Sequence, residues 1–140
     1  DSTQVKRVQR LVQGQDKGVI ITARLPRSEV VKIQRKAQLL LLFSHRGTKG
    51  IPSSKLYEYL GLRKPILLSP GDNDVLEDTV AKYNLGKTAS TEAEIYNYLC
   101  NLYETFCEGK SNQITADEEY IKRFTRKSQT KILSTILQKL

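Results

Sequence analysis

The chain has 140 residues, of which 39% are hydrophobic and 27% charged, and it carries a net charge of +8. These values fit one domain with a substantial core and exclude a disordered or low-complexity protein. The longest apolar run, Leu39–Phe43, has the length of a strand and is far shorter than the ~20 residues of a transmembrane helix. The N-terminus shows no signal-peptide pattern, and the sequence contains no Met, so we expect an excised piece of a longer protein.

The positive charge is concentrated at the two ends of the chain. Residues 1–36 sum to +6 and residues 110–140 to +4, whereas residues 37–109 sum to −2. Two solvated helix faces explain this distribution, and an anionic partner is the alternative: a membrane surface, a missing acidic domain or nucleic acid. Cys100 and Cys107 lie two helical turns apart, too far for a disulfide, so we expect buried thiols in a reducing compartment.

The first third of the chain predicts two helices and two strands. Apolar residues recur at helical spacing over residues 3–13 and over Glu29–Ala37. Val19–Thr22 is rich in β-branched residues and Leu39–Phe43 is wholly apolar, which indicates two strands, the second buried on both faces.

The remainder of the chain continues to alternate helices with strands after a polar loop at residues 44–50. Helices are expected from a cap at Ser53 or Ser54 to Leu60, over Val75–Tyr83, from a capping box at Thr91 to Cys107, and from Ala116 onward with a break around Arg126–Gln129. Strands are expected over Pro65–Ser69 and Lys87–Ala89. The alternation predicts an α/β fold, a Rossmann-like parallel sheet with helices on both faces and one or two strands missing upstream.

Ligands of such sheets bind at the carboxyl ends of the strands, so the loop after Phe43 and the helix that follows form the candidate site. The amides and dipole of a helix start favour a phosphate, to which Ser53 and Ser54 add hydroxyls and Lys55 a positive charge. Glu58, one turn further, is an acceptor for paired sugar hydroxyls. A capped surface helix with solvated Lys55 and Glu58 is the alternative.

Other side chains near this edge have simpler interpretations. His45, the only histidine, could carry a proton but fits an ordinary loop residue better. Tyr57 and Tyr59 fit core or interface positions better than base stacking. Three acidic residues fit a helix N-terminus better than a metal site, so no metal is expected: Asp72, Asp74 and Asp78.

The segment Lys55–Leu67 resembles the K-x-x-E-Y-x-x-x-x-K-P-[IV] pattern of group 1, family 4-like glycosyltransferases, which have the GT-B fold. Val19–Val31 resembles the strand-turn-helix segment GRVPREEV of that family, with Ala23 where glycine is usual. Leu39–Ser44 resembles its strand before the donor loop, and Ile121–Arg126 resembles the start of its closing helix.

The resemblance implies the C-terminal half of a GT-B fold, the domain that binds the nucleotide sugar. Glu58 then binds the ribose hydroxyls. The resemblance places three residues near the diphosphate, Ser53, Ser54 and Lys55, and two beside the base, Arg24 and Leu25. Many members have two glutamates separated by seven residues, and Gly50 stands in place of the first, so acidic help near the donor sugar is not implied. No catalytic residue is assigned in this chain, because the acceptor site and the catalytic histidine of the family lie in the other half.

We therefore expect residues 1–110 to form a nucleotide-sugar-binding domain truncated at its N-terminus. Residues 111–140 then form a helical segment that packs on it or back toward a missing N-terminal domain. The full enzyme would transfer a sugar from a UDP- or GDP-sugar to an acceptor hydroxyl without a metal cofactor, and the fragment alone would be inactive.

A sugar-nucleotide epimerase of the same architecture is the enzyme alternative, and a non-catalytic nucleotide or nucleic-acid binding module is the other. We expect no nucleic-acid partner, because the basic clusters lack interleaved aromatic residues. A cytoplasmic location is expected, and peripheral contact of the full-length enzyme with a membrane stays open.

Overall fold

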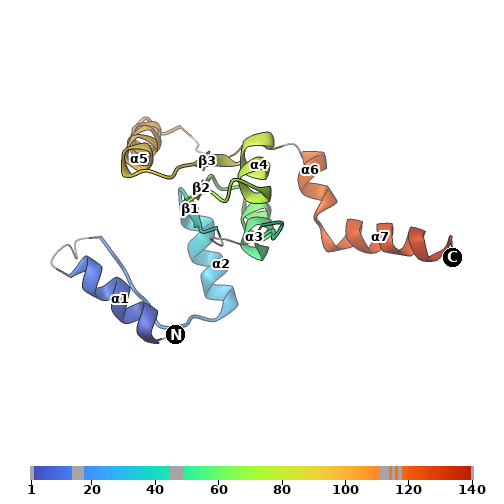
Figure 1. Cartoon of the computed structure of the whole chain (residues 1–140), viewed down its shortest axis with the longest axis horizontal. Coiled ribbons are helices and arrows are strands. Elements are labelled where there is room, and N and C mark those ends of the chain that lie inside the picture. Colours follow the sequence, from blue (N-terminus) through green and yellow to red (C-terminus); the bar gives the residue numbers. More distant parts are fainter. Residues whose placement is uncertain are drawn as a thin grey trace. The chain divides into compact units, whose positions relative to one another are not determined.

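The structure is a computed structural model (Figure 1) that describes residues 2–13, 18–44, 49–110, 114, 116 and 118–139. Its helices are α1 (Ser2–Val12), α2 (Arg27–Lys36), α3 (Ser54–Leu62), α4 (Val75–Lys82), α5 (Glu92–Cys107), α6 (Glu118–Arg123) and α7 (Arg126–Leu137). Its strands are β1 (Leu40–Leu42), β2 (Ile66–Leu68) and β3 (Gly86–Thr88). The chain forms two compact units, Asp1–Ile33 and Gln34–Leu140, and each is described by itself.

The first unit contains α1, which confirms the helix predicted over residues 3–13. Residues 19–26 have no regular secondary structure, so the strand predicted over Val19–Thr22 is wrong. β-Branched residues favour an extended backbone, but a strand also needs a neighbour to complete its hydrogen bonds. The described part of this unit contains no such strand, and Ile20 is 88% exposed.

The second unit is built around a parallel sheet of three short strands in the order β1-β2-β3. Leu40 pairs with Ile66, which in turn pairs with Gly86, so the strands are aligned in register. Each strand is joined to the next by a helix, α3 or α4, which confirms the α/β class. The strand expected over Lys87–Ala89 is present one residue earlier, as β3.

The core lies between the sheet and the two crossover helices, which lie on the same side of it (Figure 1). Right-handed crossovers explain this placement, because strands added in one direction put both connecting helices on one face. The core side chains come from β1, β2, α3 and α4 and from Leu85, and each is at most 2% exposed: Leu42, Leu56, Leu60, Ile66, Leu68, Leu76, Val80 and Leu85.

The other face of the sheet differs from the prediction. Leu41 points away from this core and is 46% exposed, so the expectation that its strand is buried on both faces is wrong. The helix–strand packing of the second unit involves α3 and α4. A helical layer on the opposite face would follow from strands added beyond β1 in the other direction. The described residues contain no strand beyond β1.

Helix α5 begins with the predicted capping box. The Thr91 hydroxyl accepts a hydrogen bond from the Glu94 amide (3.3 Å), and the Glu94 carboxylate accepts one from the Thr91 amide (3.1 Å). None of the α5 side chains described is fully buried. The expected burial of the cysteines is therefore wrong: Cys100 is half-buried and Cys107 is exposed, and both are free thiols.

Helix α6 returns to the core through Tyr120, which is 7% exposed and stacks on Tyr83 at the end of α4. The predicted break lies between α6 and α7, two residues earlier than expected, because Thr125 caps α7. In the part of the chain described, none of the helices combines the length and apolar character needed to cross a membrane.

Candidate functional site

The candidate site begins where the loop after β1 enters α3. Ser53 is the N-cap of this helix, with extended backbone angles (φ −68°, ψ 134°), and its hydroxyl accepts a hydrogen bond from the Lys55 amide at 3.3 Å. The Leu56 amide donates to the Ser53 carbonyl at 3.0 Å. This confirms a predicted cap, with Ser53 in that role and Ser54 as the first, exposed residue of the helix.

Lys55 and Glu58 form an ion pair along the first turn of α3. The Lys55 ammonium group donates to Glu58 Oε2 at 2.9 Å, and the two side chains are 51% and 29% exposed. Such exposed pairs contribute about 0–1 kcal/mol, so either group can change partner at little cost. The pair therefore holds a cation and a hydrogen-bond acceptor together at the solvent-facing start of the helix.

Tyr59 fixes α3 against the sheet. Its hydroxyl donates to the Leu41 carbonyl at 3.3 Å, and its ring packs against the core, which confirms the core role expected for it. Burial raises the pKa of Tyr59, Lys55 lowers it and Glu58 raises it. Tyr57 is 37% exposed and contacts Phe124 of the α6–α7 junction, with ring centroids 5.0 Å apart. Both tyrosines thus hold α3 in place, and the side chain of Glu58 between them in the sequence is 29% exposed.

A second loop borders the site and is tied to the first. The Gly50 amide donates a hydrogen bond to the carboxylate of Asp74, and the Ser44 hydroxyl donates to the Gly71 carbonyl at 3.3 Å. These bonds join the loops that follow β1 and β2. No pattern in the sequence predicts the contact between Gly50 and Asp74, which are 24 residues apart. Position 50 is a glycine and supplies no carboxylate, but its amide donates a hydrogen bond to the carboxylate of Asp74 in the neighbouring loop.

Backbone amides at the start of α4 already have a hydrogen-bond acceptor from the same chain. The carboxylate of Asp72 accepts hydrogen bonds from the amides of Asp74, Leu76 and Glu77 at 3.1, 3.0 and 3.0 Å. This confirms that the acidic turn serves a helix N-terminus. The described residues contain no group of His, Cys, Asp or Glu arranged to hold a metal ion. Of these two helix starts at the carboxyl edge of the sheet, that of α3 carries the cationic side chain, Lys55.

The structure brings together four of the six predicted binding residues: Ser53, Ser54, Lys55 and Glu58. Arg24 is exposed and Leu25 half-buried, and both belong to the first unit, so the structure gives them no geometry relative to Glu58. His45 lies outside the described residues.

No protein-family model matches the chain, and no match was found among curated proteins or solved structures. A function is therefore inferred from the fold and from the first turn of α3.

Proposed function

We propose that the chain is the donor-binding domain of a glycosyltransferase of the GT-B type. The full-length enzyme would transfer a sugar from a nucleoside-diphosphate sugar to an acceptor hydroxyl. One observation carries the proposal: Ser53, Ser54 and Lys55 begin a helix directly after a parallel strand, with Glu58 one turn further on. The carboxyl edge of parallel strands is where α/β proteins bind ligands.

The diphosphate of the donor would bind at the first turn of α3. The helix dipole and the amides there favour an anion, and the bond between the Ser53 hydroxyl and the Lys55 amide is long, at 3.3 Å. A phosphate oxygen can replace this hydroxyl at little cost, since the hydroxyl can itself turn and donate to the phosphate. The Lys55 ammonium group then exchanges Glu58 for the phosphate.

The ribose would bind to Glu58. The carboxylate of Glu58, whose side chain is 29% exposed, would accept hydrogen bonds from the two neighbouring hydroxyls of the sugar as Lys55 turns toward the diphosphate. Bonds to a charged acceptor contribute about 1.5–3 kcal/mol each, more than those between neutral groups. The exchange of partners by Lys55 and Glu58 therefore couples diphosphate binding to ribose binding.

Catalysis in the full enzyme would rest on stabilising the departing diphosphate. Negative charge grows on the diphosphate oxygen as the bond between the sugar and the diphosphate of the donor breaks. Prearranged amides and cations stabilise that charge. This chain supplies the helix start and Lys55. The acceptor and the remaining cations would come from the other half of the cleft, so this domain alone is expected to bind nucleotide without turnover.

Titration calorimetry with UDP, GDP and a short DNA duplex tests the proposal. Saturable binding of one nucleoside diphosphate, with weak and salt-sensitive binding of DNA, supports it. Binding of DNA with no response to either nucleotide contradicts it and favours a nucleic-acid binding module, because affinity that falls steeply with salt marks phosphate-backbone contacts. Turnover of a UDP-sugar to its epimer by a longer form of the protein would instead favour an epimerase.

A further inference from the structure

The last helix, α7, has an apolar face that the described residues leave uncovered. Its four aliphatic side chains are 51–59% exposed: Ile132, Leu133, Ile136 and Leu137. Their spacing places them side by side on one face of the helix. A packed helix would bury such a face, so this one is available to a partner.

The charge around this face has a single sign. Residues 126–139, which are α7 and the two residues after it, contain four Lys or Arg and no Asp or Glu. Lys127 and Lys131 lie one turn apart on the side of α7 opposite to Ile136, as the helical period of 100° per residue requires. Solvated helices usually mix both signs, whereas a cationic polar face opposite an aliphatic face is typical of helices that lie in a membrane interface.

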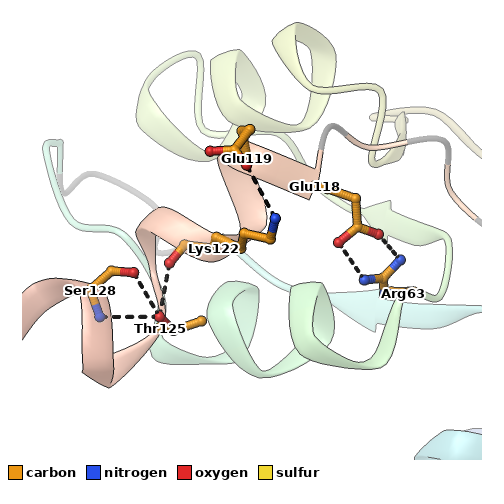
Figure 2. A network of polar contacts seen from close by, with 6 residues as sticks. All are labelled: Arg63, Glu118, Glu119, Lys122, Thr125 and Ser128. Atoms are coloured by element: carbon orange, nitrogen blue, oxygen red, sulfur yellow. Dashed lines mark hydrogen bonds and ion pairs between the residues drawn. The ribbon is translucent and has the colours of Figure 1, made fainter.

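The helix is already formed and is held by the second unit. Thr125 caps it by accepting a hydrogen bond from the Ser128 amide at 3.2 Å, as Figure 2 shows. The Gln129 side chain donates to the Arg123 carbonyl at 2.6 Å. Helix α6 carries α7 and is fixed to the core by Tyr120. Binding through α7 therefore does not require the folding of a disordered segment, which would lower the affinity.

We propose that α7 binds the surface of an anionic lipid bilayer. The four aliphatic side chains would enter the boundary between headgroups and acyl chains, and the basic side chains would lie among the phosphates. Nucleic acid would use the charge but not the aliphatic face. A protein partner would use the aliphatic face, but nothing about a protein surface requires four basic and no acidic residues on the helix that carries it.

The membrane proposal does not depend on the proposed function. Vesicle binding is measured without nucleotide, so either proposal can fail alone.

Co-sedimentation of the chain with vesicles tests the proposal. The chain should bind vesicles of phosphatidylglycerol and phosphatidylcholine, and bind pure phosphatidylcholine at least about tenfold more weakly, since each basic residue near an anionic surface contributes about 1 kcal/mol. Leu133→Ser with Ile136→Ser should abolish binding. The matched substitutions Leu99→Ser with Tyr103→Ser, on the exposed face of α5, should leave binding unchanged.

A charge control separates α7 from the basic N-terminal helix. Lys127→Gln with Lys131→Gln should weaken binding to the anionic vesicles on the order of tenfold or more. Lys6→Gln with Arg10→Gln removes the same charge from α1 and should weaken it far less. Equal binding to neutral and anionic vesicles, or a greater loss from the α1 pair than from the α7 pair, would overturn the proposal.

A fluorescent reporter gives an independent measurement, because the chain contains no Trp. The emission of Ile136→Trp should shift to the blue when anionic vesicles are added, as the indole leaves water. The emission of Lys131→Trp, on the opposite side of the helix, should shift much less. Equal shifts at the two positions, or no shift at position 136, would contradict the proposed orientation.

Discussion

The guanidinium group of Arg63 donates two hydrogen bonds to the carboxylate of Glu118, which lies 55 residues further along the chain. Arg63 ends α3 in the left-handed conformation (φ 55°), and Glu118 begins α6 (Figure 2). The pair is therefore a direct link between the helix of the candidate site and the C-terminal helices. Hydrogen bonding to Arg63 lowers the pKa of Glu118, and the same bonds raise the pKa of Arg63.

The lowered pKa of Glu118 predicts a pH-dependent contribution to stability. A carboxylate whose pKa is lower in the folded state stabilises the protein above its unfolded pKa, and this contribution is lost as the pH falls through the folded value. Glu118→Gln should lower the thermal midpoint slightly around neutral pH, since the pair is exposed. The difference from wild type should shrink as the pH falls below 4.5 and through the lowered pKa of Glu118. A difference that stays unchanged as the protein is acidified through this range would contradict the role of the ion pair.

Truncation of the core should cost much more than truncation of an exposed side chain of the same type. Leu60 is 1% exposed and Leu133 is 56% exposed. Leu60→Ala should lower the free energy of unfolding by about 2–5 kcal/mol, through lost burial and a residual cavity. Leu133→Ala should change it by roughly 0.5 kcal/mol or less. Urea denaturation measures both, and similar losses would place Leu60 outside the core.

Two glycines should respond in opposite ways to alanine. Gly86 has φ +147°, and an added methyl group would collide with the backbone of Ile66 on the neighbouring strand. Gly61 lies within α3, and a methyl group there would meet nothing within 4 Å. Gly86→Ala should therefore separate β3 from β2 and strongly reduce folded protein. Gly61→Ala should raise stability by about 0.5–1 kcal/mol.

Circular dichroism and thermal unfolding would record both glycine variants. A normally folded Gly86→Ala protein would show that β3 does not approach β2 as closely as described.

The local features of the fold were predictable and the long-range ones were not. The capping box at Thr91 and the extent of helix α4 follow from residues close together in the chain. Val19–Thr22 has the composition of a strand, but pairing depends on a neighbour that its own sequence does not specify. The prediction that Leu41 is buried failed for a similar reason, since burial of a strand's second face depends on elements elsewhere in the chain.

The candidate site shows the same division. Ser53 as a cap and the pairing of Lys55 with Glu58 follow from spacing along one helix. The bond from Gly50 to Asp74 joins two loops that meet only because β1 and β2 are parallel neighbours. No local pattern predicts such a contact.

The tyrosine that joins α6 to the core predicts a loss of stability at high pH. Burial, followed by the neighbouring Tyr83 and Tyr57, raises the pKa of Tyr120 from 10.0 to about 12. Between these values the unfolded chain releases the proton and the folded protein keeps it, so stability falls as the pH rises above 10.0. Thermal midpoints of wild type should therefore decline more steeply in this range than those of Tyr120→Phe. Parallel declines would show that Tyr120 does not titrate as described.

The most direct test of the account is whether Glu58 binds a ribose. Calorimetry would compare the nucleoside diphosphate that binds wild type with its 2′-deoxy form, for wild type and for Glu58→Ala. Loss of the 2′-hydroxyl should weaken binding to wild type roughly tenfold or more, because a hydrogen bond to a charged acceptor is removed. It should barely affect Glu58→Ala, and Glu104→Ala on α5 should behave as wild type. The same loss of affinity in wild type and in Glu58→Ala would contradict the account.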